Sequence, residues 1–363
     1  MAFADRARVA RIQRQLIGWY EQSRRDLPWR RTRDPYAIWV SEVMLQQTQV
    51  ATVRDYFERF MRRFPSVEAL ASSTTDDVLH TWQGLGYYTR ARGLLAGARA
   101  VVERHGGRVP DDPAELRALP GVGPYTAGAI ASIAFDRPEP IVDGNVTRVL
   151  CRLFGLSGDP KRRPLSAELW QIARSLVPHE AASSFNQGLM ELGATLCVPK
   201  LPRCEKCPIK AECRALAEDR VAELPERGRR ARVSAVHMVA ALIFRSDRVL
   251  VVKLPENAPR WAGMWQFPAS ELGRRETPEA ALRRVARESS GLEVTPVGLT
   301  LVVRHSVTRF SITLDAYRCR PSSGRARASR GSELLWRSPE ELGALAMPSA
   351  HRRIAVRLSA EPP

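Results

Sequence analysis

The chain has 363 residues, of which 44% are hydrophobic, an ordinary share for a folded globular protein. No apolar run is long enough to span a membrane, and the start MAFADRARVARIQRQ lacks the apolar core of a signal peptide, so the sequence predicts a cytoplasmic protein. The net charge of +17 is carried largely by arginine and favours a polyanionic partner, although genome bias also produces arginine-rich chains.

The first part of the chain shows helical spacing of its apolar residues. Residues 5–22 form one such pattern, and Asp34 with Pro35 opens a second helix that runs through YAIWVSEVMLQQTQV. Up to Cys213 no segment alternates with the period of a strand, so this part is predicted to be all-α. Further helices are expected at 49–63, 66–70, 75–82, 87–104, 113–118, 145–154, 165–177 and 182–196.

The pattern changes after Arg214. Residues 217–234 are polar and charged with little periodicity, as in a linker. The β-branched runs VHMVAALIF and RVLVVKL follow, joined by a short turn that indicates a hairpin. A helix from Thr277 to about Ser290, strands near 294–304 and 309–318, a loop at 321–331 and a last short helix at 339–345 complete an α+β unit.

The stretch LPGVGPYTAGAI contains a tight turn followed by an apolar helix. Gly121 and Gly123 permit backbone angles that a side chain forbids, and the turn presents N–H groups at a helix N-terminus, which suits a phosphate oxygen. About twenty residues on, VDGNV presents Asp143 at the next helix start. The alternatives are a plain Gly-x-Gly turn and a plain helix cap.

Four of the six cysteines are closely spaced. Their pattern is Cys197-x6-Cys204-x2-Cys207-x5-Cys213. In an intracellular chain such a group favours metal ligation over disulfides. Four thiolates at this spacing can hold one [4Fe–4S] cluster, whereas zinc, the competing metal, usually takes two CxxC pairs and only one is present.

Together these motifs resemble the helix-hairpin-helix DNA glycosylases. RRDLPWR, SEVMLQQTQV and GLGYYTRARGL narrow the resemblance to adenine DNA glycosylases of the MutY type, over essentially all of residues 20–213. The resemblance implies base excision repair of adenine mispaired with 8-oxoguanine or, less efficiently, guanine. It also implies one [4Fe–4S] cluster held by the four cysteines.

The residue after Gly123-Pro124 separates two mechanisms. In the related bifunctional endonuclease III type a lysine at this position forms a Schiff base with the sugar. Here it is Tyr125, which cannot form an imine. The sequence therefore favours a monofunctional glycosylase that uses water. The alternatives are a bifunctional glycosylase/lyase and a non-catalytic mismatch-binding protein.

Two carboxylates match the catalytic pair of the family. Glu42 lies in an apolar helix, where a carboxyl tends to have a raised pKa and can donate a proton. Adenine leaves once its N7 is protonated, which is a general-acid task. Asp143 is expected to stay ionised beside Asn145 and to stabilise an oxocarbenium-like sugar. The resemblance groups Tyr125 and Asn145 with this pair.

The resemblance also implies residues that bind DNA and the extruded base. The adenine pocket matches Arg25, Leu27, Trp29, Arg30 and Val50. The contacts to DNA match Gln47, Thr48, Leu85, Tyr87, Gly121 and Gly123.

The C-terminal unit resembles a Nudix domain. A Nudix hydrolase needs several acids on one helix to bind metal, but RRVARESSGL has Glu288 alone, so metal-dependent hydrolysis is not predicted. In the resembled family this domain recognises 8-oxoguanine through a Phe-Ser-His loop. This chain has Val307-Thr308-Arg309 there, and Thr308 keeps the hydroxyl.

The predicted architecture has three parts. Residues 1–216 form an all-α glycosylase domain, with a six-helix module at about 30–135 and a cluster module from 1–29 with 136–216. Residues 217–234 link it to a Nudix-like 8-oxoguanine-recognition domain at 235–363. We expect a cytoplasmic, nucleoid-associated bacterial monomer that binds double-stranded DNA and no membrane. Replication or repair proteins as partners cannot be identified from any motif.

Overall fold

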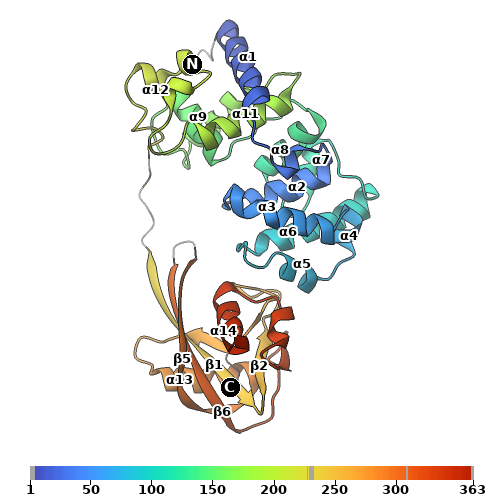
Figure 1. Ribbon diagram of the computed structural model, residues 1–363, viewed down its shortest axis with the longest axis vertical. Helices are drawn as coiled ribbons and strands as arrows, with labels where there is room; N and C mark the ends of the chain where they lie inside the picture. Colours follow the sequence, from blue (N-terminus) through green and yellow to red (C-terminus); the bar gives the residue numbers. More distant parts are fainter. Residues whose placement is uncertain (1–4, 227, 229–232, 308–309, 361–363) are drawn as a thin grey trace. The chain divides into compact units, whose positions relative to one another are not determined.

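The computed structural model describes residues 5–226, 228, 233–307 and 310–360 (Figure 1). These fold into two compact units, Met1–Ser72 with Arg92–Arg230 and Ser73–Ala91 with Ala231–Pro363. The first unit is built of helices and the second of a sheet with helices, which confirms the predicted combination of fold classes. Among the described residues, no helix is both long enough and apolar enough to cross a membrane.

The first unit follows the predicted helices closely. α2 (Pro35–Leu45) is shorter than predicted, because the backbone leaves helical angles at Gln46, with a ψ of 114°, and at Gln47, with a φ of 56°, before α3 (Val50–Arg63) begins. The other helices are α1 (Arg6–Ser23), α4 (Val67–Ala71), α6 (Thr89–His105), α7 (Pro113–Ala118), α8 (Pro124–Phe135), α9 (Gly144–Phe154), α10 (Leu165–Leu176), α11 (Ala182–Thr195) and α12 (Arg214–Ala217), with 3₁₀ turns η1 (Pro28–Arg30), η2 (Cys204–Lys206) and η3 (Lys210–Glu212).

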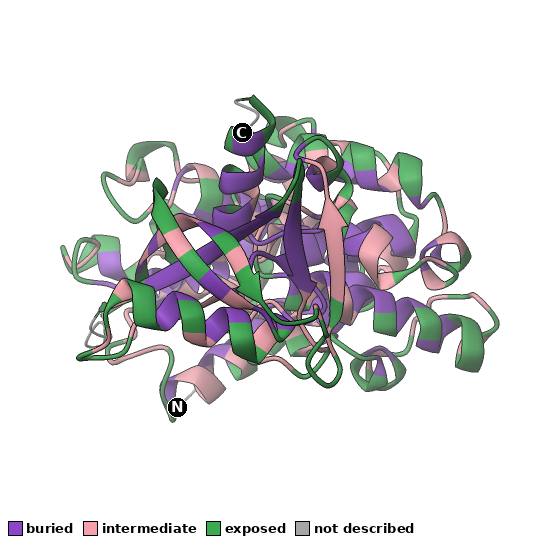
Figure 2. Cartoon of the chain, turned by 90° about the horizontal axis from the view of Figure 1, so that it is seen from below, coloured by how far each residue is buried: buried purple, intermediate pink, exposed green. Residues whose placement is uncertain are grey.

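Two helices are buried on all sides. Every residue of α2 from Tyr36 to Met44 is buried, and so is every residue of α8 from Thr126 to Ile133. The two helices pack against each other. A helix that is apolar all round belongs in the interior, whereas Figure 2 also shows helices with one buried and one exposed face. Polar side chains on α2 and α8 are therefore removed from bulk water.

A helical hairpin joins α7 to α8. Gly121 has a φ of 77°, and a Cβ there would lie 2.8 Å from the Cα of Gly93. Both the backbone angle and the close approach require glycine at this position. Pro124 then starts α8 at a position where its missing N–H costs no helical hydrogen bond.

The second unit contains a mixed sheet with the strand order β3-β2-β1-β6-β5, in which β4 pairs with β1 and β7 with β2. β1 and β6 are parallel and the other pairs are antiparallel. The strands are β1 (Ser234–Arg245), β2 (Arg248–Lys253), β3 (Trp265–Gln266), β4 (Ala269–Glu271), β5 (Glu293–Val307), β6 (Phe310–Ser323) and β7 (Glu333–Arg337). The helices are α5 (Thr75–Thr81), α13 (Pro278–Ser290), η4 (Glu341–Ala344) and α14 (Ser349–Ala360).

Each face of the sheet has its own core. Along β1, Leu242 faces a cluster that includes Ile354 of α14, and Ile243 faces a cluster that includes Leu282 of α13. The sequence prediction missed β3, β4, β7 and α14. Three closely spaced arginines at 352, 353 and 357 mask the apolar face of α14, which becomes evident only when Ile354 and Leu358 are buried.

Candidate active site

Glu42 is a buried carboxyl on α2, with 3% of its surface exposed. Its Oε2 accepts a 2.5 Å hydrogen bond from the hydroxyl of Tyr125 on α8. Burial raises the pKa of Glu42 to about 7; the Tyr125 hydrogen bond and Arg30 oppose this rise, and the charge of Asp143 adds to it. A carboxyl with this pKa keeps a proton on a large fraction of molecules at neutral pH, so it can act as a general acid.

Asp143 is the N-cap of α9. Its Oδ1 accepts a 2.7 Å hydrogen bond from the N–H of Val146, and its Oδ2 accepts one of 3.1 Å from Nδ2 of Asn145. Burial raises the pKa of Asp143, while these hydrogen bonds oppose the rise. Asp143 is thus a helix cap, and it also lies in the wall of a cavity with Glu42. A role as a helix cap is therefore compatible with a role in a functional site.

That cavity has a volume of about 390 Å³ and lies within the first unit. This size suits a small organic group such as a base. It brings together the predicted residues Arg25, Leu27, Trp29, Arg30, Glu42, Gln47, Thr48, Val50, Tyr125, Asp143 and Asn145. Lining residues that the sequence did not single out include Gln46, Gln187, Met190 and Glu191.

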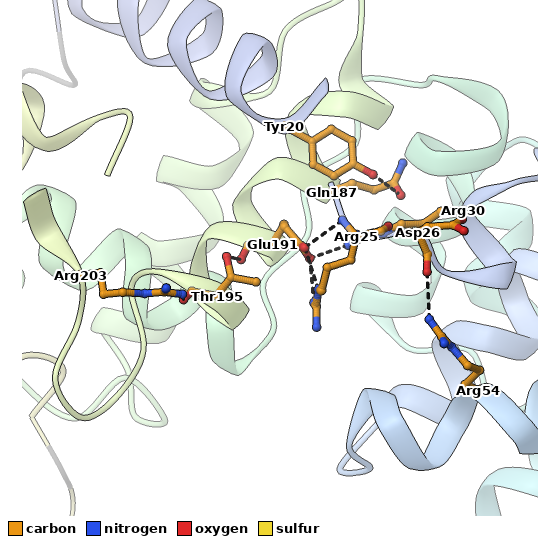
Figure 3. Close-up of polar contacts among 9 residues, drawn as sticks. All are labelled: Tyr20, Arg25, Asp26, Arg30, Arg54, Gln187, Glu191, Thr195 and Arg203. Carbon is orange, nitrogen blue, oxygen red and sulfur yellow. Dashed lines mark hydrogen bonds and ion pairs between the residues drawn. The ribbon is translucent and has the colours of Figure 1, made fainter. Parts of the chain in front are cut away.

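An ion-pair network forms another part of the cavity wall (Figure 3). Glu191 on α11 is 1% exposed and accepts hydrogen bonds of 2.7 Å from Nε and Nη2 of Arg25 and of 2.8 Å from Nη2 of Arg30. Burial favours the protonated form of Glu191, but the two guanidinium groups outweigh it and lower the pKa to about 2. The carboxylate is therefore charged at neutral pH and fixes the orientation of both arginines.

A second polar contact supports the same wall. The hydroxyl of Tyr20 on α1 donates a 2.9 Å hydrogen bond to Oε1 of Gln187, as Figure 3 shows. The guanidinium of Arg30 lies 5.5 Å from the centre of the Tyr20 ring. Tyr20 thus contacts two side chains that line the cavity.

The other predicted DNA contacts lie outside this cavity lining. Gly121 and Gly123 are in the α7–α8 hairpin, and Leu85 and Tyr87 are in the turn between α5 and α6. In that turn Leu85 is 6% exposed, whereas Tyr87 is 39% exposed and has a φ of 49°. Thr308 lies outside the described residues.

The four clustered cysteines line one small cavity. Arg152 contributes to its wall and donates from Nη1 to Sγ of Cys197 at 3.3 Å. Burial raises the pKa of the Cys204, Cys207 and Cys213 thiols, that of Cys207 to about 11. In the described part of the chain no group of three or more His, Cys, Asp or Glu residues is arranged to hold a single metal ion.

Arg148 connects the cysteine loop with the start of α9. Its Nε donates to the carbonyl of Cys197 at 2.7 Å, and its Nη2 donates to Oδ1 of Asn145 at 2.9 Å. Asn145 in turn donates to Asp143. The position of the cysteine loop is therefore linked to the Asp143 carboxylate through three hydrogen bonds.

In the second unit, α13 carries Glu279 in its first turn and the candidate acid Glu288 near its end. Glu288 is exposed and lies 3.5 Å from Nη1 of Arg284. Glu288 and Arg284 thus form an ion pair at the surface. The sequence does not predict metal-dependent Nudix hydrolysis for this chain.

Comparison with known proteins identifies the class to which this site belongs. Residues 40–175 match the HhH-GPD superfamily of base excision DNA repair proteins, and residues 239–357 match the NUDIX domain family. A solved thermostable thymine-DNA glycosylase is 32% identical with a TM-score of 0.53, covering 58% of this chain and 98% of that chain. A non-covalent endonuclease III–DNA complex, 22% identical with a TM-score of 0.51 over 60% of this chain and 98% of that one, shares the fold. The chain is a DNA glycosylase with a helix-hairpin-helix domain.

Curated relatives narrow the class further. The rat adenine DNA glycosylase is 38% identical over 368 residues, covering 87% of this chain and 71% of the rat protein. The human adenine DNA glycosylase is 50% identical over 222 residues, covering 59% of this chain and 41% of the human protein. That of Buchnera aphidicola (subsp. Acyrthosiphon pisum) is 41% identical over 211 residues, covering 58% of this chain and 60% of that protein. The chain belongs to the adenine DNA glycosylase family, as the sequence motifs predicted, and hydrolyses N-glycosyl bonds.

Proposed function

We propose that this protein excises adenine mispaired with 8-oxoguanine, and less efficiently with guanine, by hydrolysis and without strand-cleaving lyase activity. One observation carries the proposal: Glu42, whose pKa is about 7, and the helix-capping Asp143 line the same cavity of about 390 Å³. The absence of a lysine at position 125 supports hydrolysis over Schiff-base chemistry.

The two carboxyl groups divide the chemistry. Glu42 donates its proton to N7 of the extruded adenine, which turns the base into a better leaving group. Tyr125 holds the Glu42 carboxyl in place through its hydroxyl. Asp143, fixed by the N–H of Val146 and by Asn145, stabilises the positive charge that develops on the sugar. The N-glycosidic bond breaks, water adds to C1′ of the sugar, and the proton that the water loses passes to the Glu42 carboxylate, which restores the acid.

The remaining proposed residues bind the base and the DNA. The adenine lies against Arg25, Leu27, Trp29, Arg30 and Val50, which all line the cavity. Tyr87, with Leu85 and Gln47, occupies the space that the flipped base leaves. Thr48, Gly121 and Gly123 contact the DNA backbone. In the proposed domain scheme (1–216, 217–234 and 235–363), the last part recognises 8-oxoguanine through the loop that contains Thr308.

The four cysteines are proposed to hold one [4Fe–4S] cluster, a group that stabilises the fold of their loop when bound. Each thiolate of such a cluster binds a different iron atom, so the ligands are spread more widely than around one ion. Four cysteines that line one cavity without a single-ion arrangement among the described residues fit this requirement better than zinc. Measuring iron, sulfide and zinc in the purified protein tests the assignment: about four irons and four sulfides per chain support it, and one zinc contradicts it.

Single-turnover release of adenine tests the main proposal. The substrates are matched duplexes with adenine opposite 8-oxoguanine, guanine or thymine. Fast release opposite 8-oxoguanine, slower release opposite guanine and none opposite thymine is expected. Equal rates opposite 8-oxoguanine and guanine would remove lesion recognition from the proposal, and no release from any duplex would remove the adenine assignment.

Two further measurements address the alternatives. Borohydride traps a covalent adduct with a lyase, so an adduct would favour the bifunctional mechanism. Asp143→Asn should abolish release while DNA binding persists; unchanged behaviour in every assay would favour a non-catalytic binder. We also propose a cytoplasmic, nucleoid-associated monomer, which gel filtration of the protein and imaging of a tagged copy can check.

A further inference from the structure

The turn between α5 and α6 has an unusual backbone. Gly84, Gly86 and Tyr87 have φ values of 105°, 71° and 49°. The first two are glycines, for which positive φ has no steric cost, but Tyr87 is an aromatic residue in a left-handed conformation. Such a conformation persists only when surrounding contacts hold it. Tyr87 is also 39% exposed, whereas its neighbours Leu85 and Tyr88 are buried.

Arg90, in the first turn of α6, supplies those contacts. Its Nη2 donates to the carbonyl of Leu85 at 3.3 Å and to that of Gly86 at 3.2 Å. The centre of the guanidinium lies 5.4 Å from the centre of the Tyr87 ring. It also lies 5.5 Å from the centre of the Trp82 ring. One side chain therefore contacts both the backbone of the turn and the ring that the turn presents.

Trp82 completes the arrangement. Its Nε1 donates to the carbonyl of Gly86 at 3.1 Å, so that carbonyl accepts from two donors. Burial lowers the pKa of Arg90 to about 10, which still leaves it charged at neutral pH. A charged, half-buried guanidinium forms stronger hydrogen bonds to carbonyls than a neutral group would.

We propose that Arg90 is a positioning residue that holds Tyr87 in the conformation in which its ring enters the DNA stack. This inference rests on the proposed wedge role of Tyr87. A ring held in advance loses less conformational freedom on insertion, so the extruded state of the adenine is favoured. Arg90 itself touches neither the base nor the sugar.

The planar guanidinium matters as well as its charge. It can donate to two carbonyls and stack against aromatic rings at the same time, whereas an ammonium is a compact point charge. Arg90→Lys should therefore fail to restore function. If Arg90 instead contacts a DNA phosphate, lysine should largely restore binding, because lysine is a good phosphate ligand.

The experiment uses the full-length protein and a duplex with 2-aminopurine next to the adenine opposite 8-oxoguanine, whose fluorescence reports base extrusion. Arg90→Met, Arg90→Lys and Tyr87→Ala are compared with Arg104→Met, a control at an exposed position of the same helix. We expect Arg90→Met and Arg90→Lys each to reduce the extrusion equilibrium roughly tenfold, as expected for the loss of charge-assisted hydrogen bonds. Circular dichroism verifies that the variants are folded. If Arg90→Met does not fold, Arg90→Lys still tests the proposal.

A double-mutant cycle and a salt titration decide between the interpretations. Under the proposal, Arg90→Met has no further effect on extrusion in a Tyr87→Ala background, and the salt dependence of DNA binding is unchanged. Additive effects, or rescue by lysine with a salt slope that falls by about one in Arg90→Met, would overturn it. If Tyr87→Ala alone leaves extrusion unchanged, the wedge role in the proposed function fails, and that outcome is separate from a failure of Arg90.

Discussion

Two buried glutamates line the same cavity and have opposite properties. Glu42 on α2 is 3% exposed and has a pKa of about 7, whereas Glu191 on α11 is 1% exposed and has a pKa of about 2. Their burial is similar, so burial alone does not explain the difference. Glu42 accepts a hydrogen bond from the neutral Tyr125 hydroxyl, and Glu191 accepts hydrogen bonds from two guanidinium groups.

This comparison separates two tasks of a buried carboxyl. Glu42 keeps a proton that it can give to a base, and Glu191 keeps a charge that holds Arg25 and Arg30 against the cavity. The nearest partner decides the task, because a positive neighbour repays the desolvation of a carboxylate and a neutral one does not. Variants of the two glutamates should therefore differ in kind, and the following predictions test this.

The largest effect is expected on catalysis. Glu42→Gln keeps the shape of the side chain but removes its acidic proton, so adenine release should slow by about a thousandfold. Single-turnover release opposite 8-oxoguanine measures this. Glu21→Gln, at an exposed position of α1, is the matched control and should release adenine at the wild-type rate. A Glu42→Gln enzyme within tenfold of wild type would show that Glu42 is not the acid.

Glu42→Gln should also stabilise the folded protein at alkaline pH. The folded-state pKa of Glu42, about 7, is higher than its ordinary value of 4.5. Its contribution to stability is therefore full below pH 4.5 and is lost as the pH rises through about 7. At pH 9 Glu42→Gln should be more stable than wild type by up to about 3 kcal/mol. Denaturant unfolding at pH 5 and pH 9 checks this, and a variant that is less stable at pH 9 contradicts it.

Glu191→Gln should have the opposite effect on stability and should lower the free energy of unfolding. The substitution leaves the guanidinium groups of Arg25 and Arg30 without their carboxylate. The free energy of unfolding should therefore fall by about 2 kcal/mol at neutral pH, less than for a fully buried pair because Arg25 is partly exposed. The pKa of Glu191 is depressed, so its contribution is present above pH 4.5 and is lost as the pH falls through about 2. Unfolding curves of wild type and variant should converge in acid. A constant difference down to pH 2 would contradict the ion-pair explanation.

The smallest effect concerns Tyr125. Its hydroxyl lowers the pKa of Glu42 by hydrogen bonding to the charged form. Tyr125→Phe should therefore raise the pKa of Glu42 further. Since release needs protonated Glu42, the wild-type rate should fall above pH 7 and the variant's rate should fall from a higher pH. The pH dependence of single-turnover release measures both, and a shift towards lower pH would contradict the assignment.

The motifs of the sequence were sufficient to predict that Glu42, Tyr125 and Asp143 lie in one site, because each belongs to a local pattern with a chemical meaning, and all three line the same cavity. Glu191 was missed although it also lies in an apolar helix, between Met190 and Leu192. That pattern could have identified it as buried. Its charge state could not be predicted, since Arg25 and Arg30 are more than 160 residues away in the chain.

The fold also divides into parts that local sequence patterns predict and parts that depend on backbone angles or distant contacts. Helices with a clear apolar period were predicted nearly to the residue, as for α7. The predicted end of α2 was wrong because the helix breaks at Gln46 and Gln47, and glutamine is not a residue type that indicates a helix end. α14 was missed because its apolar face is narrow and becomes recognisable only when the sheet of the second unit covers Ile354 and Leu358.

Asp143 caps α9 with the carboxylate that is proposed to act on the sugar. Asparagine is among the best N-cap residues, whereas alanine is poor. An asparagine at this position should therefore leave the helix start intact while removing the negative charge. Such a variant would hold an uncleaved duplex long enough for crystallisation, with its extruded adenine still attached to the sugar.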